Sequence, residues 1–134
     1  MDLVGVPAQY LDVVWNDVKD RIAYVLETLS DEEVSVDEMQ RMIANREAQL
    51  WTTNDKQSVC ITRILKKLHH TEMVVWVLHS DNFCEEHWNL LDQIKEWARA
   101  QGCTKSRIVA RPGFEKILVK HGWKRRHITL TQEI

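Results

Sequence analysis

The sequence predicts a single α/β (α+β) domain over residues 1–134, and three observations support this class. The length of 134 residues suits one hydrophobic core rather than two. Hydrophobic residues make up 44% of the chain and charged residues 28%, which is the balance of a globular protein. Apolar residues recur at helical spacing in some segments and run without interruption or alternate in others, so helices and strands are both expected.

The first part of the chain predicts one short strand and two helices. Leu3–Val6 is an apolar run ended by Pro7 and is a candidate first strand. Apolar residues then recur at helical spacing from Leu11 to Leu29. Ser35–Glu38 has the form of a capping box, in which serine and glutamate satisfy backbone groups at a helix start. We therefore expect a second helix from there through about Ala44.

The middle of the chain predicts three strands. The candidates are Ala48–Thr53, Val59–Leu68 and Met73–Leu78, and Asn54-Asp55 forms a turn after the first. The third candidate is apolar at every position, which suits a central strand covered on both faces.

The last part of the chain predicts two helices and two strands. A long helix carries Trp88 and Trp97 on one side and ends at Gly102, where a helix C′ residue is expected. Ser106–Ala110 is a short strand, and Pro112 begins a helix that stops at Gly122. The alternation of His127–Thr131 predicts a half-buried final strand. The predicted order is β-α-α-β-β-β-α-β-α-β.

Charge is distributed unevenly, although the net charge is only −2. Residues 1–55 contain 12 acidic and 4 basic side chains, whereas residues 56–134 contain 8 acidic and 14 basic ones. Within residues 105–127, eight Lys or Arg side chains accompany one acid, Glu115. Such a stretch attracts a phosphate, a nucleic acid or an acidic protein surface, or is simply a solvated surface.

Nothing in the sequence indicates export or a membrane. No apolar run approaches the roughly 20 residues of a membrane span, and the N-terminus lacks the pattern of a signal peptide. Cys60, Cys84 and Cys103 are an odd number of cysteines without CxxC spacing, so we expect reduced thiols in a cytoplasmic protein. Cys84 and His87 could share a helical turn, and only His69-His70 could supply a second pair of zinc ligands. We interpret the cluster as polar residues around a helix start and expect no metal site.

The segments Trp88–Cys103, Arg107–Phe114 and Lys120–Leu130 resemble the GNAT acyltransferase superfamily. Within it, they are similar to short GNAT-like proteins, many encoded in tailed-phage genomes and most without an assigned function. The resemblance covers nearly the whole chain. It implies a mixed, mostly antiparallel sheet with helices on both faces and a splay between Met73–Leu78 and Ser106–Ala110. For a phage protein, the location is the host cytoplasm or the virion.

The resemblance also implies where acetyl-CoA would bind. In GNAT enzymes the pyrophosphate lies on backbone amides in a segment of the form R/Q-x-x-G-x-G/A. The corresponding segment here, His79–His87, has no glycine and contains three acids, Asp81, Glu85 and Glu86. Acids near a helix start repel an anion there, so we expect a degraded site and no cofactor. If acetyl-CoA binds, the candidate residues are His79, Ser80, Asn82, Phe83 and Cys84.

The catalytic groups that the resemblance implies are also incomplete. A tyrosine in the last helix commonly protonates the departing thiolate, and Leu118 is at its position in Ile117–Trp123. Leucine cannot donate a proton. Glu72 and His79 are the candidates for a general base, and Tyr10 and Tyr24 are interpreted as packing residues.

Three functions remain open on the sequence. The first is a GNAT-fold protein of phage type that binds another protein, phage structural or host, through a basic surface. Its residues would be Arg111, Lys120, Trp123, Lys124, Arg125 and Arg126. The second is an acetyl-CoA-dependent N-acetyltransferase with an atypical pyrophosphate loop. The third is a nucleic-acid-binding module that uses the basic residues of 105–127.

Overall fold

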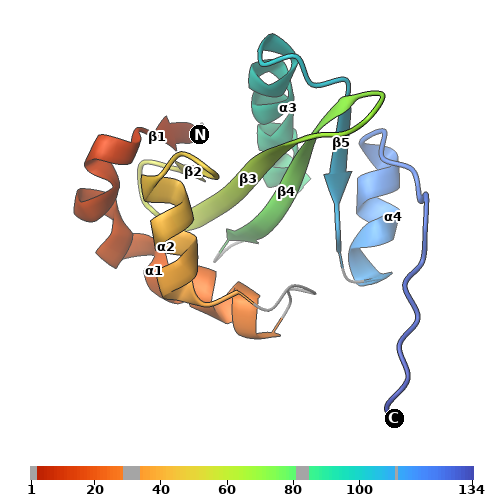
Figure 1. Cartoon of the computed structure of the whole chain (residues 1–134), viewed down its shortest axis with the longest axis horizontal. Helices are drawn as coiled ribbons and strands as arrows, with labels where there is room; N and C mark the ends of the chain where they lie inside the picture. The colour runs from red at the N-terminus through yellow and green to blue at the C-terminus, as the bar shows by residue number, and fades with distance from the viewer. Residues whose placement is uncertain (1–2, 29–33, 81–84, 111) are drawn as a thin grey trace.

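A five-stranded sheet forms the centre of the molecule, with two helices on each face (Figure 1). This computed structural model describes residues 3–28, 34–80, 85–110 and 112–134. The strands lie side by side in chain order, β1 to β5. The mixed α+β class predicted from the sequence is confirmed.

The sheet is antiparallel except at one pair. Strands β1 (Val4–Val6), β2 (Gln49–Thr52), β3 (Ser58–Lys66) and β4 (Thr71–Ser80) pair antiparallel in succession. Strand β5 (Lys105–Ile108) pairs parallel to β4 and ends the sheet. The connection from β4 to β5 contains a helix, as parallel strands require.

One face of the sheet is covered by α1 (Leu11–Thr28) and α2 (Val36–Ala44), which follow the short 3₁₀ helix η1 (Ala8–Tyr10). The predicted capping box forms, because the backbone N–H of Glu38 donates to Ser35 Oγ at 3.0 Å. The apolar stripe of α1 is buried against α2 and the sheet. Its members are Leu11, Trp15, Val18, Ile22, Val25 and Leu26.

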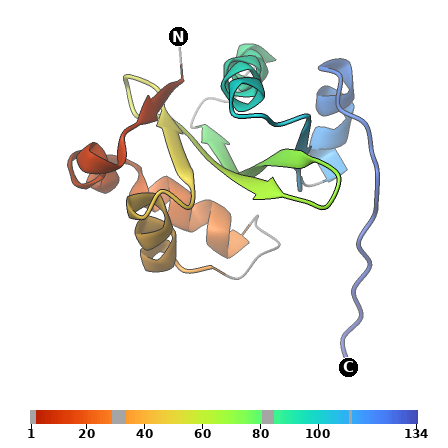
Figure 2. The same ribbon diagram turned by 45° about the horizontal axis from the view of Figure 1, so that its top comes forward.

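The opposite face is covered by α3 (Glu85–Ala100) and α4 (Pro112–Lys120) (Figure 2). Both helices end as the sequence predicts. Gly102 and Gly122 each have φ of +91°, and the following residues, Cys103 and Trp123, donate back to carbonyls in the last turns. Glycine is favoured at these positions because the left-handed backbone costs it nothing.

The sheet therefore separates two apolar clusters. The first contains the α1 stripe, Met39 and Ile43 of α2, and Val59, Ile61 and Val77 of the sheet. The second joins Leu91, Ile94 and Ala98 of α3 and Leu118 of α4 to Trp51, Met73 and Val75. Trp51 packs edge-to-face on Trp97, with ring centroids 5.2 Å apart. These clusters fix where β4 and β5 lie.

The predicted final strand is wrong. Residues 123–134 have no regular secondary structure, and the apolar side chains of 127–131 are exposed, Ile128 at 64% and Leu130 at 85%. Alternation alone does not make a strand, because a strand needs a neighbour to pair with. Residues 127–131 have no such neighbour in the described part of the chain, because the last strand of the sheet, β5, pairs with β4 alone.

Candidate functional site

Strands β4 and β5 run together for only part of the length of β4. Pairing extends from Glu72 opposite Lys105 to Val75 opposite Ile108, and β5 ends there. Strand β4 continues for five more residues, Trp76–Ser80. We call residues 72–75 the paired end of β4 and residues 76–80 its open end. The open end leaves β4 backbone groups without a β5 partner, as the predicted splay requires.

A β-bulge marks the start of the open end. Ile61 of β3 pairs with Val77 and Thr62 pairs with Val75, so Trp76 is an extra residue on β4. A bulge interrupts the hydrogen-bonding ladder and increases the local twist. The guanidinium of Arg63 lies 4.2 Å from the centroid of the Trp76 ring, while the indole N–H of Trp76 is buried without a hydrogen-bond acceptor.

The open end carries a histidine beside a tyrosine. His79 is half-buried, and its ring centroid lies 5.5 Å from that of Tyr24 on α1. Tyr24 is 50% exposed and Tyr10 is 54% exposed, so the interpretation of both as packing residues is wrong. Tyr24 lies outside the apolar stripe of α1. Its position in the helical repeat could have indicated from the sequence that its ring is exposed, but not that it meets His79. An imidazole and a phenol at this position can exchange a proton with a bound group.

Glu72 lies at the paired end, opposite to His79 along the strand. It is 7% exposed, and its Oε1 accepts from Arg107 Nε at 3.2 Å, with Lys67 Nζ 3.8 Å away. His70 Nε2 is 3.5 Å from its other oxygen. Burial raises the pKa of this carboxyl, but the His70 hydrogen bond and the charges of Arg107 and Lys67 outweigh burial and lower it. The seven residues to His79 span about 23 Å in a strand, so the two base candidates do not meet.

Several solved structures with the same fold are described as acetyltransferases. A protein described as a probable acetyltransferase is 17% identical over 100% of this chain and 98% of its own, with a TM-score of 0.69. A predicted acetyltransferase of Clostridium acetobutylicum, solved with acetyl-CoA, is 11% identical over 98% and 95%, with a TM-score of 0.70. Glucosamine-6-phosphate N-acetyltransferase of Arabidopsis thaliana is 11% identical over 98% and 97%, with a TM-score of 0.65. The chain has the GNAT acetyltransferase fold. No protein-family model matches the sequence, and neither does any curated protein.

Few of the cofactor candidates can be placed at the open end of β4. Ser80 is buried, and its hydroxyl is 2.9 Å from that of Ser58 on β3, so it is used within the sheet. Asn82, Phe83 and Cys84 lie outside the described residues. The other two cysteines, Cys60 and Cys103, are free and buried, and burial raises the pKa of both thiols. Neither is therefore activated as a nucleophile.

Leu118 is part of the core. Its side chain is 5% exposed and belongs to the cluster between the sheet and α3 and α4. This is the position at which the GNAT resemblance implies a tyrosine that protonates the thiolate. An apolar, buried side chain there can contribute packing but no proton.

The predicted basic surface is placed as follows. Lys120 ends α4 and is exposed, as are Lys124 and Arg126. Arg125 donates to both carboxylate oxygens of Glu115, at 2.7 and 2.5 Å. Trp123 is half-buried against the second core cluster, with Lys95 Nζ 5.3 Å from its ring centroid. Arg111 lies outside the described residues. That these residues form one binding face stays a prediction.

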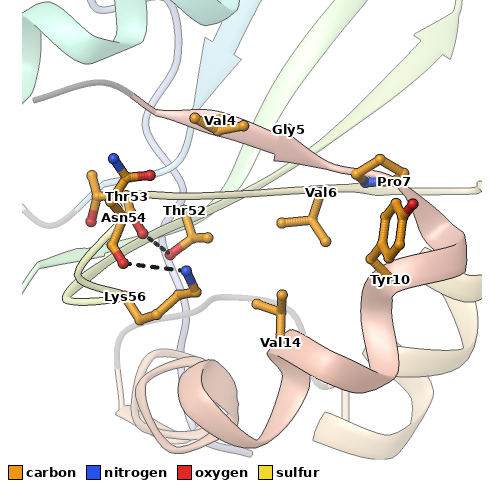
Figure 3. A pocket seen from close by; sticks show the side chains of 10 residues that line it. All are labelled: Val4, Gly5, Val6, Pro7, Tyr10, Val14, Thr52, Thr53, Asn54 and Lys56. Atoms are coloured by element: carbon orange, nitrogen blue, oxygen red, sulfur yellow. Dashed lines mark hydrogen bonds between the residues drawn. The ribbon is translucent and has the colours of Figure 1, made fainter.

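A small pocket lies on the α1 side of the sheet, between β1, the start of α1 and the β2–β3 turn (Figure 3). Val4, Val6 and Val14 form its apolar wall, and the ammonium of Lys56 lies 3.3 Å from the carbonyl of Asn54 at its rim. Its volume is about 200 Å³. Pockets for drug-sized ligands usually have volumes of about 300–1,000 Å³, so this hollow is too small for a large cofactor.

In the described ranges, no three His, Cys, Asp or Glu side chains are grouped so that they could bind a metal ion. None of the helices in the same ranges has the length and apolar composition of a membrane-spanning segment.

Proposed function

We propose that this GNAT-fold chain has a degraded acetyl-CoA site and acts by binding another protein. The observation that carries this proposal is Leu118, which is buried in the core where an acetyltransferase would need a proton donor for the thiolate. Glu72 does not replace it, because its carboxylate is ionised and paired with cations far from the open end.

The sequence of the pyrophosphate segment supports the same proposal. Residues 79–87 contain three acids and no glycine. Without glycine the backbone cannot approach phosphates closely, and each acid near the start of α3 disfavours an anion by about 0.3–1 kcal/mol. Together these features oppose tight binding of a cofactor whose pyrophosphate must lie there.

Protein binding is supported by what the C-terminal arm, residues 124–134, exposes. It begins with three basic residues and continues with the exposed apolar side chains of Ile128, Leu130 and Ile134. Exposed apolar side chains beside arginine are typical of protein interfaces. By its resemblance to short phage-encoded proteins, we propose that the partner is a phage structural protein or a host protein.

Titration of acetyl-CoA into the purified protein tests the proposal. We expect a Kd no tighter than about 1 mM, which corresponds to about −4 kcal/mol. A matched variant, Asp81→Asn with Glu85→Gln and Glu86→Gln, should bind acetyl-CoA more tightly than the wild type if the acids repel it. Asp92→Asn, farther along α3, is the control and should change nothing. Micromolar binding by the wild type would contradict the proposal.

A second candidate is acetyl transfer from acetyl-CoA to an amine, and the Tyr24–His79 pair at the open end favours it. In this mechanism the amine nitrogen attacks the thioester carbonyl, the C–S bond breaks and the thiolate takes a proton. His79 would accept the amine proton. The assay follows release of the free thiol with a set of amine substrates. Release that His79→Ala abolishes would establish this candidate.

A further inference from the structure

The hollow between β1, the start of α1 and the β2–β3 turn has an apolar wall whose side chains are partly uncovered (Figure 3). Val4 and Val6 are two residues apart on β1 and point to the α1 face of the sheet, where Val14 of α1 lies across from them. Val4 is 52% exposed, and Tyr10, which also lines the hollow, is 54% exposed. Single exposed apolar residues are ordinary. Here two of them line one concavity, where an apolar ligand would cover both.

Lys56 is the one charged side chain among the described residues that line this hollow. It is half-buried, although lysine is rarely buried unless it is paired. Within the described ranges, its ammonium contacts the carbonyl of Asn54 at 3.3 Å and no carboxylate. The neighbouring acid, Asp55, accepts instead from the hydroxyl of Thr53 at 2.6 Å and from the N–H of Gln57 at 3.0 Å. A half-buried ammonium at the rim of an apolar hollow favours an anion there.

The backbone of Lys56 supports a role for its side chain. Its φ is +61°, in the left-handed region that glycine and asparagine adopt more readily than lysine. The turn holds this conformation, because the N–H of Lys56 donates to the carbonyl of Thr53 at 3.0 Å. Glycine or asparagine would suit the turn better, so the turn itself does not explain the lysine. The place where the lysine puts its ammonium does.

This hollow is separate from the other two candidate sites. Strand pairing puts Val4, Thr52, Val59 and His79 in one row across four strands. Three strand spacings amount to about 14 Å, so β1 at the hollow is well away from the open end of β4. The C-terminal arm lies at the opposite side of the molecule in both views (Figures 1 and 2). A ligand here therefore goes beyond the proposed protein-binding function.

We propose that this hollow binds a small carboxylic acid with a branched apolar body, in its ionised form. The valines cover the apolar body, and the ammonium of Lys56 pairs with the carboxylate. One cation balances one negative charge, which favours a carboxylate over a phosphate monoester with its charge of about −1.5 to −2. The volume of about 200 Å³ limits the ligand to a molecule smaller than a nucleotide.

The experiment uses the full chain at neutral pH and 3-methylbutanoate as the probe, followed through the methyl signals of carbon–proton NMR spectra. Three control ligands separate charge from shape. The amide 3-methylbutanamide has the shape without the charge, 3-methylbutylamine has the opposite charge, and acetate has the charge without the apolar body. We expect saturable shifts of the methyl groups of Val4, Val6 and Val14 with 3-methylbutanoate, and at least tenfold weaker binding of each control. The methyl groups of Val119 on α4 should not shift.

Variants test the role of Lys56. Lys56→Asn removes the charge but suits the left-handed backbone, so binding should weaken at least tenfold while the Tm does not fall. Lys56→Gly is a second variant with the same expected result. Lys66→Asn is the matched control, because Lys66 is an exposed lysine at the other end of β3, and its binding should stay within twofold of the wild type.

Three results would overturn the proposal. The first is no saturable shift with 3-methylbutanoate, or shifts centred on His79 or the arm instead of the valines of the hollow. The second is binding of 3-methylbutanamide as tight as that of the acid, because the charge would then contribute nothing. The third is equal binding by the wild type and the folded Lys56→Asn and Lys56→Gly variants.

Discussion

The two ends of β4 differ in what surrounds their ionisable side chains. At the paired end, β5 lies alongside the strand, and Glu72 is buried among Arg107, Lys67 and His70. At the open end β5 has stopped, and His79 lies half-buried beside an exposed tyrosine. Both residues are general-base candidates by type. Their surroundings make Glu72 part of a structural ion-pair cluster. His79 instead lies next to Tyr24, whose ring is exposed to a ligand.

The comparison shows that pairing with β5, rather than residue type, decides which ionisable side chain of β4 has a structural role and which is available to a ligand. A buried carboxylate whose oxygens are already bonded to cations is stabilised as a charge and is a weak base. Histidine is the side chain most often used for proton transfer in catalysis, and His79 is only half-buried. Substitutions at the paired end should therefore lower the free energy of unfolding more than substitutions at the open end.

The largest effect is expected from the packing that supports both ends. Trp97→Ala removes a ring that packs on Trp51 and the second core cluster. We expect the free energy of unfolding to fall by about 3 kcal/mol, the lower part of the range for such deletions, because Trp97 is only half-buried. Chemical denaturation measures it, with exposed Glu96→Ala as the control. A loss below about 1 kcal/mol would mean that this contact does not support the sheet.

The next largest effect is expected at the paired end. Glu72→Gln keeps the shape of the side chain but removes the charge that Arg107 and Lys67 face. Hydrogen bonds to charged groups contribute about 1.5–3 kcal/mol, so a loss of about 2 kcal/mol in unfolding free energy is expected. Glu133→Gln in the arm should cost less than about 0.5 kcal/mol. Equal effects of the two substitutions would remove the distinction between the paired end and the surface.

The paired end should also control the acid sensitivity of the fold. The pKa of Glu72 is lower in the folded protein than its ordinary value of 4.5. Its contribution to stability is therefore full above that value and is lost as the pH falls through the folded pKa. The unfolding free energy of Glu72→Gln should fall less steeply below about pH 4.5 than that of the wild type. Parallel curves would show that Glu72 does not supply this dependence.

The sequence predicted most of the fold because local rules decided most elements. The capping serine before α2, the glycines after α3 and α4, and the apolar run of β4 each specify structure within a few residues. The prediction for 127–131 was wrong because a strand depends on its neighbour, and these residues pair with none of the five strands of the sheet.

The candidate site was less predictable because it depends on contacts between distant segments. The side chains that contact the carboxylate of Glu72 come from the β3–β4 hairpin and β5. Tyr24 and His79 are 55 residues apart in the sequence. Helical phase could have shown that Tyr24 is exposed, but no local pattern indicates which residue of β4 it meets.

The smallest stability effect is expected at the open end. Tyr24→Ala and His79→Ala each remove one member of a ring pair, which contributes about 0.5–1.5 kcal/mol. Because Tyr24 is half exposed, we expect losses of at most about 1 kcal/mol. A double-mutant cycle by denaturation measures the coupling. A loss above about 2 kcal/mol in either single variant would make the open end as structural as the paired end.

Isothermal titration of acetyl-CoA into the wild-type protein tests the central claim most directly, namely that the GNAT fold is kept while its cofactor site is not. Residues 79–87 are acidic and free of glycine, and Leu118 is buried in the core. The account predicts no binding tighter than about 1 mM. A micromolar Kd for the folded wild-type protein would contradict it, and the Tyr24–His79 pair would then be the first place to look for the chemistry.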